Sequence, residues 1–98
     1  MSFSGGSYEE VGRWLHNFLT SHAKRENLHA EVELERGDER EGKSYGARIR
    51  LGDHVSDLIE FDYPTVADHR GELQWCRELA ERVRHIVRDL ARSVARPS

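Results

Sequence analysis

The chain has 98 residues, of which 18 are acidic and 15 basic, so its formal net charge is -3. This length suits one domain, because a second hydrophobic core would have too few residues. The mild negative charge argues against a general affinity for phosphate backbones. No apolar run approaches the roughly 20 residues that span a bilayer, and no secretory signal is visible. We expect a single soluble domain over residues 1–98, with a flexible N-terminus at 1–6.

The cysteine and arginine usage bears on the compartment. Cys76 is the only cysteine, which excludes an internal disulfide framework and any multi-cysteine metal site. Of the 15 basic residues, all but Lys24 and Lys43 are arginine, a bias typical of a GC-rich genome. These features favour a bacterial protein in the reducing cytoplasm.

The first predicted element is a helix that begins after Ser7. Ser7 and Glu10 have the spacing of a capping box, in which each side chain bonds the backbone of the other residue. Apolar residues then recur at intervals of three and four, which predicts one buried helix face that ends near 24–27. The face consists of Val11, Trp14, Leu15, Phe18, Leu19 and His22.

Three predicted strands follow, where the apolar period changes from 3.6 to 2. They cover residues 28–35, 45–51 and 55–63, with turns at 37–43 and 52–54. Asp57 interrupts the alternation of the third strand, so the strand either has a bulge there or begins at Leu58. Arg48 and Arg50 lie between acidic neighbours on the predicted open face, which indicates cross-strand charge pairs.

A second helix is predicted from about Asp68 to Ala95, although Gly71 allows a later start. The order α-β-β-β-α predicts an α+β two-layer sandwich: a three-stranded antiparallel meander with both helices on one face. The helix would be about 40 Å long and the strands only about 26 Å. Because its apolar stripe continues to Val94, either the first helix or a second copy of the chain must cover it.

One string in the sequence satisfies the phosphate-loop pattern G-x-x-x-x-G-K-S, namely residues 37–44. A phosphate loop must open into a helix, whereas Ser44 leads into a predicted strand. Three of the four interior positions are acidic and would repel phosphate. We therefore expect a solvated hairpin turn. No histidine pair has metal-ligand spacing and no nucleophile motif appears, so we expect no metal, no cofactor and no enzymatic activity.

The apolar overhang of the second helix favours a protein that acts by protein–protein contact or by self-association into a homodimer. The residues expected at this surface are Trp75, Val83, Val87, Leu90 and Val94. An alternative is nucleic-acid binding through an arginine face of the same helix, formed by Arg77, Arg84, Arg88 and Arg92. We expect no membrane partner.

The order of elements resembles that of the double-stranded-RNA-binding module, and also that of small nucleoid-associated dimers and acidic type III secretion chaperones. The resemblance is limited to topology. The RNA-binding module begins its second helix with a lysine cluster, whereas this chain has Asp68-His69-Arg70-Gly71-Glu72 there. A third alternative is an adaptor or chaperone that binds a peptide on the open, charged face of the sheet or along an edge strand.

Overall fold

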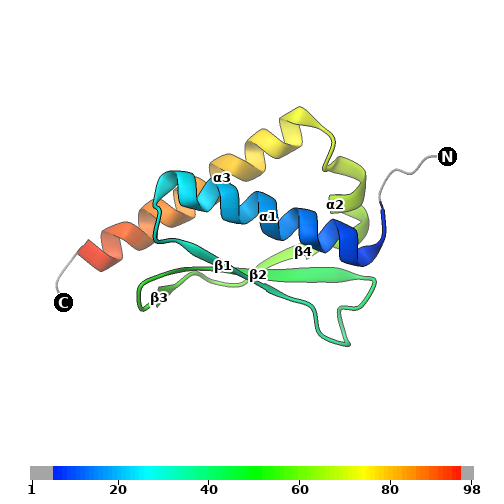
Figure 1. Ribbon diagram of the computed structural model, residues 1–98, viewed down its shortest axis with the longest axis horizontal. Coiled ribbons are helices and arrows are strands. Elements are labelled where there is room, and N and C mark those ends of the chain that lie inside the picture. Colours follow the sequence, from blue (N-terminus) through cyan, green and yellow to red (C-terminus); the bar gives the residue numbers. More distant parts are fainter. Residues whose placement is uncertain (1–5, 96–98) are drawn as a thin grey trace.

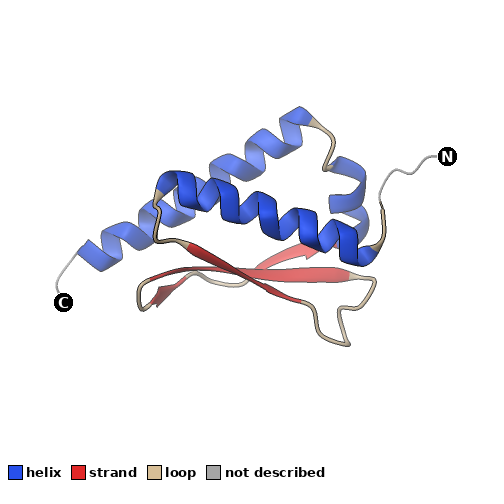
Figure 2. Cartoon of the chain, in the orientation of Figure 1, coloured by secondary structure: helices blue, strands red, loops and turns tan. Residues whose placement is uncertain are grey.

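A computed structural model describes residues 6–95. The helices cover one face of an antiparallel sheet (Figures 1 and 2), so the predicted α+β two-layer fold is confirmed. Apart from Gly6, the N-terminus expected to be flexible lies outside the described residues. The elements are α1 (Tyr8–Glu26), β1 (Glu31–Glu35), β2 (Ser44–Leu51), β3 (His54–Val55), β4 (Ile59–Asp62), α2 (Tyr63–His69) and α3 (Leu73–Ala95).

Helix α1 begins with the predicted capping box. The backbone N–H of Glu10 donates to Ser7 Oγ at 3.1 Å, and the N–H of Ser7 donates to Glu10 Oε1 at 3.2 Å. The helix ends at Glu26, where Lys24 and Arg25 complement the negative end of its dipole. Its buried face packs on the sheet and consists of Tyr8, Val11, Gly12, Leu15, Leu19 and Ala23.

The first strand begins later than predicted. Residue Leu28 was expected inside it, on the buried face, but β1 starts at Glu31 and Leu28 is 79% exposed. The cause is a turn after α1: Asn27 Oδ1 accepts from the N–H of His29 at 2.9 Å, and Asn27 O accepts from that of Ala30 at 3.0 Å. Asparagine favours such local turns, which here override the alternating pattern.

The open face of the sheet carries the predicted cross-strand charge pairs. Arg50 contacts Glu33 at 2.6 Å, and Arg48 forms an ion pair with Glu35. Each arginine of β2 therefore bonds a carboxylate diagonally across on β1, because Glu33 is the direct neighbour of Arg48. These pairs are half-exposed and compensate charge on this face, although each contributes little stability.

Strands β3 and β4 pair with the same side of β2 but in different registers. Arg50 lies opposite Val55 and Ala47 opposite Ile59, so one extra residue separates the two pairings. Such an extra residue is a β-bulge, one of the two predicted alternatives. Ser56 holds the bulge: its N–H donates to Ile49 O at 2.8 Å and its Oγ accepts from the N–H of Ile49 at 3.0 Å.

The single second helix predicted from about Asp68 is wrong, because the chain forms two helices there. Helix α2 starts five residues earlier, where Asp62 Oδ2 accepts from the N–H of Thr65 at 3.3 Å and Pro64 occupies the first turn. A break at residues 70–72 contains Gly71, a poor helix former, and separates α2 from α3.

Part of the apolar stripe of α3 is covered by the chain itself. Val83 and Val87 are 1% and 0% exposed in a core shared with α1 and the sheet, so they are not available to a partner. Leu90 is partly buried and Val94 is 48% exposed. Figure 1 shows the reason: the last turns of α3 run past the end of α1 and past β3.

Candidate functional site

The segment that matches the phosphate-loop pattern is a hairpin turn, as predicted. Residues 38–43 form turns, and Ser44 begins β2 rather than a helix. Arg40 is fixed within the turn because its guanidinium donates to both carboxylate oxygens of Glu60, at 2.8 and 3.0 Å, and to Ser44 Oγ at 3.0 Å. The turn therefore does not open into a helix of its own, as a phosphate loop requires.

Trp75, predicted as an interface anchor, lies in a row of half-buried aromatic rings. Its ring centroid is 6.3 Å from that of Trp14 on α1 and 6.0 Å from that of His69 on α2. The row continues along α1 from Trp14 to Phe18 at 5.0 Å, and from Phe18 to His22 at 4.4 Å. The two tryptophans thus join α1 to the start of α3, a contact that sequence spacing did not reveal.

The predicted arginine face of α3 is partly neutralised within the chain. Glu26 at the end of α1 contacts Arg88 Nε at 3.0 Å and Arg84 Nε at 3.7 Å. Arg92 pairs with Asp89, 3.1 Å away on the same helix. Arg77, the fourth member of the set, has no ion pair with a described residue. This arrangement lowers the positive potential that a nucleic acid would require.

The two edges of the sheet differ in how they are protected. At the β1 edge, side chains of α1 occupy the outward carbonyl groups. His16 Nε2 lies 3.0 Å from Val32 O, and Lys24 Nζ donates to Ala30 O at 2.9 Å. An unpaired edge is a template for another strand, and these contacts occupy two of the outward acceptors that such a strand would need at the β1 edge.

The opposite edge, β4, is open. Tyr63 N donates to Lys43 O at 2.8 Å, in register with the β2–β4 pairing. Since antiparallel residues alternate between facing the partner strand and facing away, the N–H and C=O groups of Leu58 and Glu60 point away from β2. No side chain among residues 6–95 bonds these outward groups. The bulge at Ser56 and the short length of β4 disfavour pairing at this edge, but neither occupies these outward groups.

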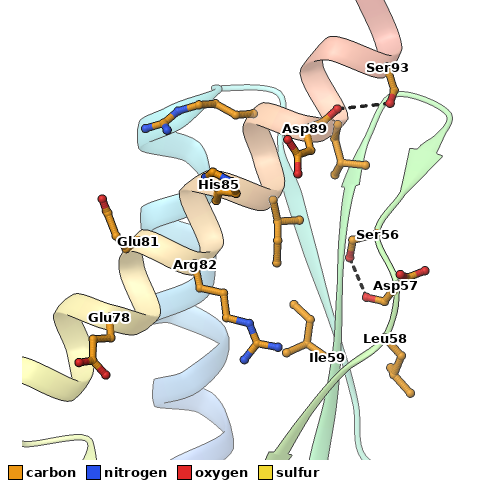
Figure 3. Close-up of a pocket in the computed structure, with 13 residues that line it drawn as sticks. Ser56, Asp57, Leu58, Ile59, Glu78, Glu81, Arg82, His85, Asp89 and Ser93 are labelled. Carbon is orange, nitrogen blue, oxygen red and sulfur yellow. Dashed lines mark hydrogen bonds between the residues drawn. The ribbon is translucent and has the colours of Figure 1, made fainter.

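A groove of about 790 Å³ runs between this edge and α3 (Figure 3). Its apolar lining includes Ile59, Ile86 and Leu90. Arg82 reaches across the groove from α3 toward Ile59. The long stem of Arg82 can cover apolar surface while its charge stays in water. The complete lining is Ser56, Asp57, Leu58, Ile59, Glu78, Glu81, Arg82, His85, Ile86, Arg88, Asp89, Leu90 and Ser93.

A second hollow of about 440 Å³ continues the groove along β4 toward Trp75. The two hollows adjoin at Glu78 and Arg82, which line both. The stretch of α3 from Trp75 to Ser93 measures about 27 Å at 1.5 Å per residue. An extended segment of about eight residues has the same length.

The lining of the groove is acidic overall. Two charged residues of the lining are compensated by ion pairs. Arg88 binds Glu26, and Asp89 binds Arg92. The carboxylates that remain outnumber the one remaining guanidinium, Arg82, by three to one. They are Asp57, Glu78 and Glu81.

Other reactive chemistry is sparse in the described part of the chain. Cys76 is half-buried, its Sγ lies 3.3 Å from Arg70 O, and burial together with the nearby charge of Glu72 raises the pKa of its thiol. A thiol in that state is a weak nucleophile. Residues 6–95 contain no cluster of three or more potential metal ligands. None of their helices has the length and apolar character needed to cross a membrane.

Comparisons with known proteins identify no relative. No family model matches the chain, and no curated protein or solved structure matches it significantly. The open β4 edge and the groove beside it are therefore the features that support a functional proposal.

Proposed function

We propose that this chain is a non-catalytic protein-binding module that receives a segment of another protein in the groove between α3 and β4. The observation that carries the proposal is the contrast between the two sheet edges. His16 and Lys24 occupy two outward carbonyl groups of the β1 edge, whereas the outward backbone groups of Leu58 and Glu60 have no side-chain partner among residues 6–95 and lie beside a partly apolar groove.

An incoming strand would gain from both walls of the groove. The backbone of Leu58 and Glu60 offers hydrogen bonds that are geometrically fixed before binding, which lowers the entropic cost of association. Ile86 and Leu90 offer apolar surface that is only partly covered in the free chain. Leu90 was expected to contact a partner from the apolar stripe of the second helix. In this proposal it makes that contact from within the groove.

Site-specific photo-crosslinking in the cells of origin tests this function. Benzoylphenylalanine is placed at Leu58 or at Ser93, on opposite walls of the groove, and in a control variant at Ser21, which is exposed on α1. We expect both groove variants to crosslink the same segment of one protein, identified by mass spectrometry, and the control to leave it unmodified. Equal crosslinking from Ser21 would contradict the proposal.

A second candidate is self-association through the protruding end of α3. The solvent exposure of the apolar side chains of α3 increases from Val83 through Leu90 to Val94. An exposed apolar helix end is a surface that a second copy of the chain can cover. Sedimentation equilibrium at micromolar concentration would then give twice the 11.4 kDa mass of one chain. Val94→Ser should abolish the dimer, whereas Leu28→Ser, at an exposed leucine elsewhere, should preserve it. A monomer at all concentrations would eliminate this candidate.

A further inference from the structure

The charges around the groove restrict what kind of segment it can accept. Asp57 lies on the strand side, and Glu78 and Glu81 lie on α3; all three are exposed and none has an ion pair with a described residue. Arg82 alone opposes them. Carboxylates on both walls attract a positively charged segment and repel a negative one.

The shape of the groove adds a requirement for apolar side chains. In a strand paired with β4, successive side chains would point alternately toward the helices and toward the open face of the sheet. On the helix side they would meet Ile86 and Leu90. On the open side they would lie near Asp62, an exposed acidic residue of β4, and near Glu60, whose charge Arg40 already compensates. The helix side therefore offers apolar contacts flanked by Glu78 and Glu81, and the open side offers the carboxylate of Asp62.

We propose that the segment bound in this groove is an extended strand of about eight residues in which basic and apolar side chains alternate. This inference rests on the proposed protein-binding function and specifies its partner. A second copy of this chain fits the edge poorly, because antiparallel pairing of β4 with itself would place acidic residues beside the same acidic residues. The positive segment must come from another protein.

A labelled octapeptide of alternating lysine and valine, acetylated and amidated at its ends, is the probe. Fluorescence anisotropy at low ionic strength measures its Kd for the full chain. We expect at least tenfold tighter binding than for the glutamate–valine octapeptide. The double variant Glu78→Gln and Glu81→Gln should weaken binding at least fivefold, and Arg82→Gln should tighten it.

Two controls separate strand addition in the groove from loose attraction between opposite charges. The variant with Glu9→Gln and Glu31→Gln makes the same change in net charge away from the groove, and it should bind the lysine–valine probe unchanged. The same probe with alternate backbone nitrogens methylated keeps its charge but loses the donors needed for pairing, so it should not bind.

Equal affinities of the lysine and glutamate probes would overturn the proposed partner, as would equal weakening by the two double variants or unchanged binding after methylation. These outcomes leave the protein-binding function itself intact if the crosslinks from Leu58 and Ser93 still identify one partner. Failure of those crosslinks together with loss of probe binding would remove both.

Discussion

Tyr8 and Tyr45, 37 residues apart, clamp the start of α1 to the sheet through reciprocal contacts. Their rings stack with centroids 4.6 Å apart. Tyr45 Oη donates to Tyr8 O at 2.6 Å, and Tyr8 Oη donates to the backbone oxygen of Ser44, the neighbour of Tyr45, at 2.5 Å. The clamp fixes where α1 lies on β2, and hence which sheet edge its side chains can reach.

The clamp predicts an alkaline sensitivity of the fold. Burial, with smaller effects of Tyr8 and Tyr63, raises the pKa of Tyr45 above its ordinary value of 10.0. The stability linked to the neutral phenol is therefore fully present below pH 10 and is lost as the pH rises above it, because the unfolded chain ionises first. Urea unfolding should show that Tyr45→Phe costs about 1 kcal/mol at pH 7 and progressively less above pH 10. A cost independent of pH would contradict this account.

Gly12 allows the close approach of α1 to Tyr45. A Cβ atom at this position would lie 2.8 Å from Tyr45 Cε1. Alanine favours a helix over glycine by about 1 kcal/mol, but overpacking costs about 1–3 kcal/mol, so we expect Gly12→Ala to lower the free energy of unfolding by about 1 kcal/mol. Gly71→Ala is the control, because a Cβ there meets nothing within 4 Å. A stabilised Gly12→Ala variant would refute the close-packing argument.

The bulge between β3 and β4 depends on the Ser56 hydroxyl. Ser56→Ala removes the acceptor of the Ile49 N–H, and we expect it to cost about 1–2 kcal/mol in thermal or urea unfolding. Ser21→Ala, at an exposed position of α1, should have almost no effect. If the two serine variants are equally stable, the hydroxyl does not hold the bulge.

Glu26 compensates two arginines of α3, so its neutralisation should affect both stability and surface charge. We expect Glu26→Gln to cost less than about 1 kcal/mol, and the cost to vanish near 1 M salt, where exposed charges are screened.

The same pairing predicts that the unaltered chain does not retard DNA or RNA in a gel at low salt. Retardation that Arg84→Gln and Arg88→Gln together abolish would revive the nucleic-acid alternative.

The sequence predicted those features whose signal is local. The capping box of Ser7 and Glu10 depends on residues three apart, and the charge pairs of Arg48 and Arg50 depend on adjacent strands. The bulge was predictable as one of two alternatives, because Asp57 breaks an otherwise regular alternation. In each case the interacting groups are close in the chain or are joined by one short turn.

The features that the sequence did not predict depend on competition or on tertiary placement. At Leu28 the alternating pattern continued, but the local turn of Asn27 took precedence. At Asp62 an N-cap began α2 where the apolar pattern still indicated a strand. The burial of Val83 and the exposure of Val94 depend on where α1 ends relative to α3, and this position cannot be predicted from the spacing of residues. The groove likewise exists only once α3 lies beside β4.

Amide hydrogen exchange at β4 tests the central claim, an open edge that receives a partner strand, most directly. In the free chain we expect slow exchange at Ile59 and Phe61, which face β2, and fast exchange at Glu60, which faces away. Addition of the lysine–valine octapeptide should slow exchange at Glu60 selectively. Slow exchange at Glu60 in the free chain, or unchanged fast exchange at saturating peptide, would contradict the account.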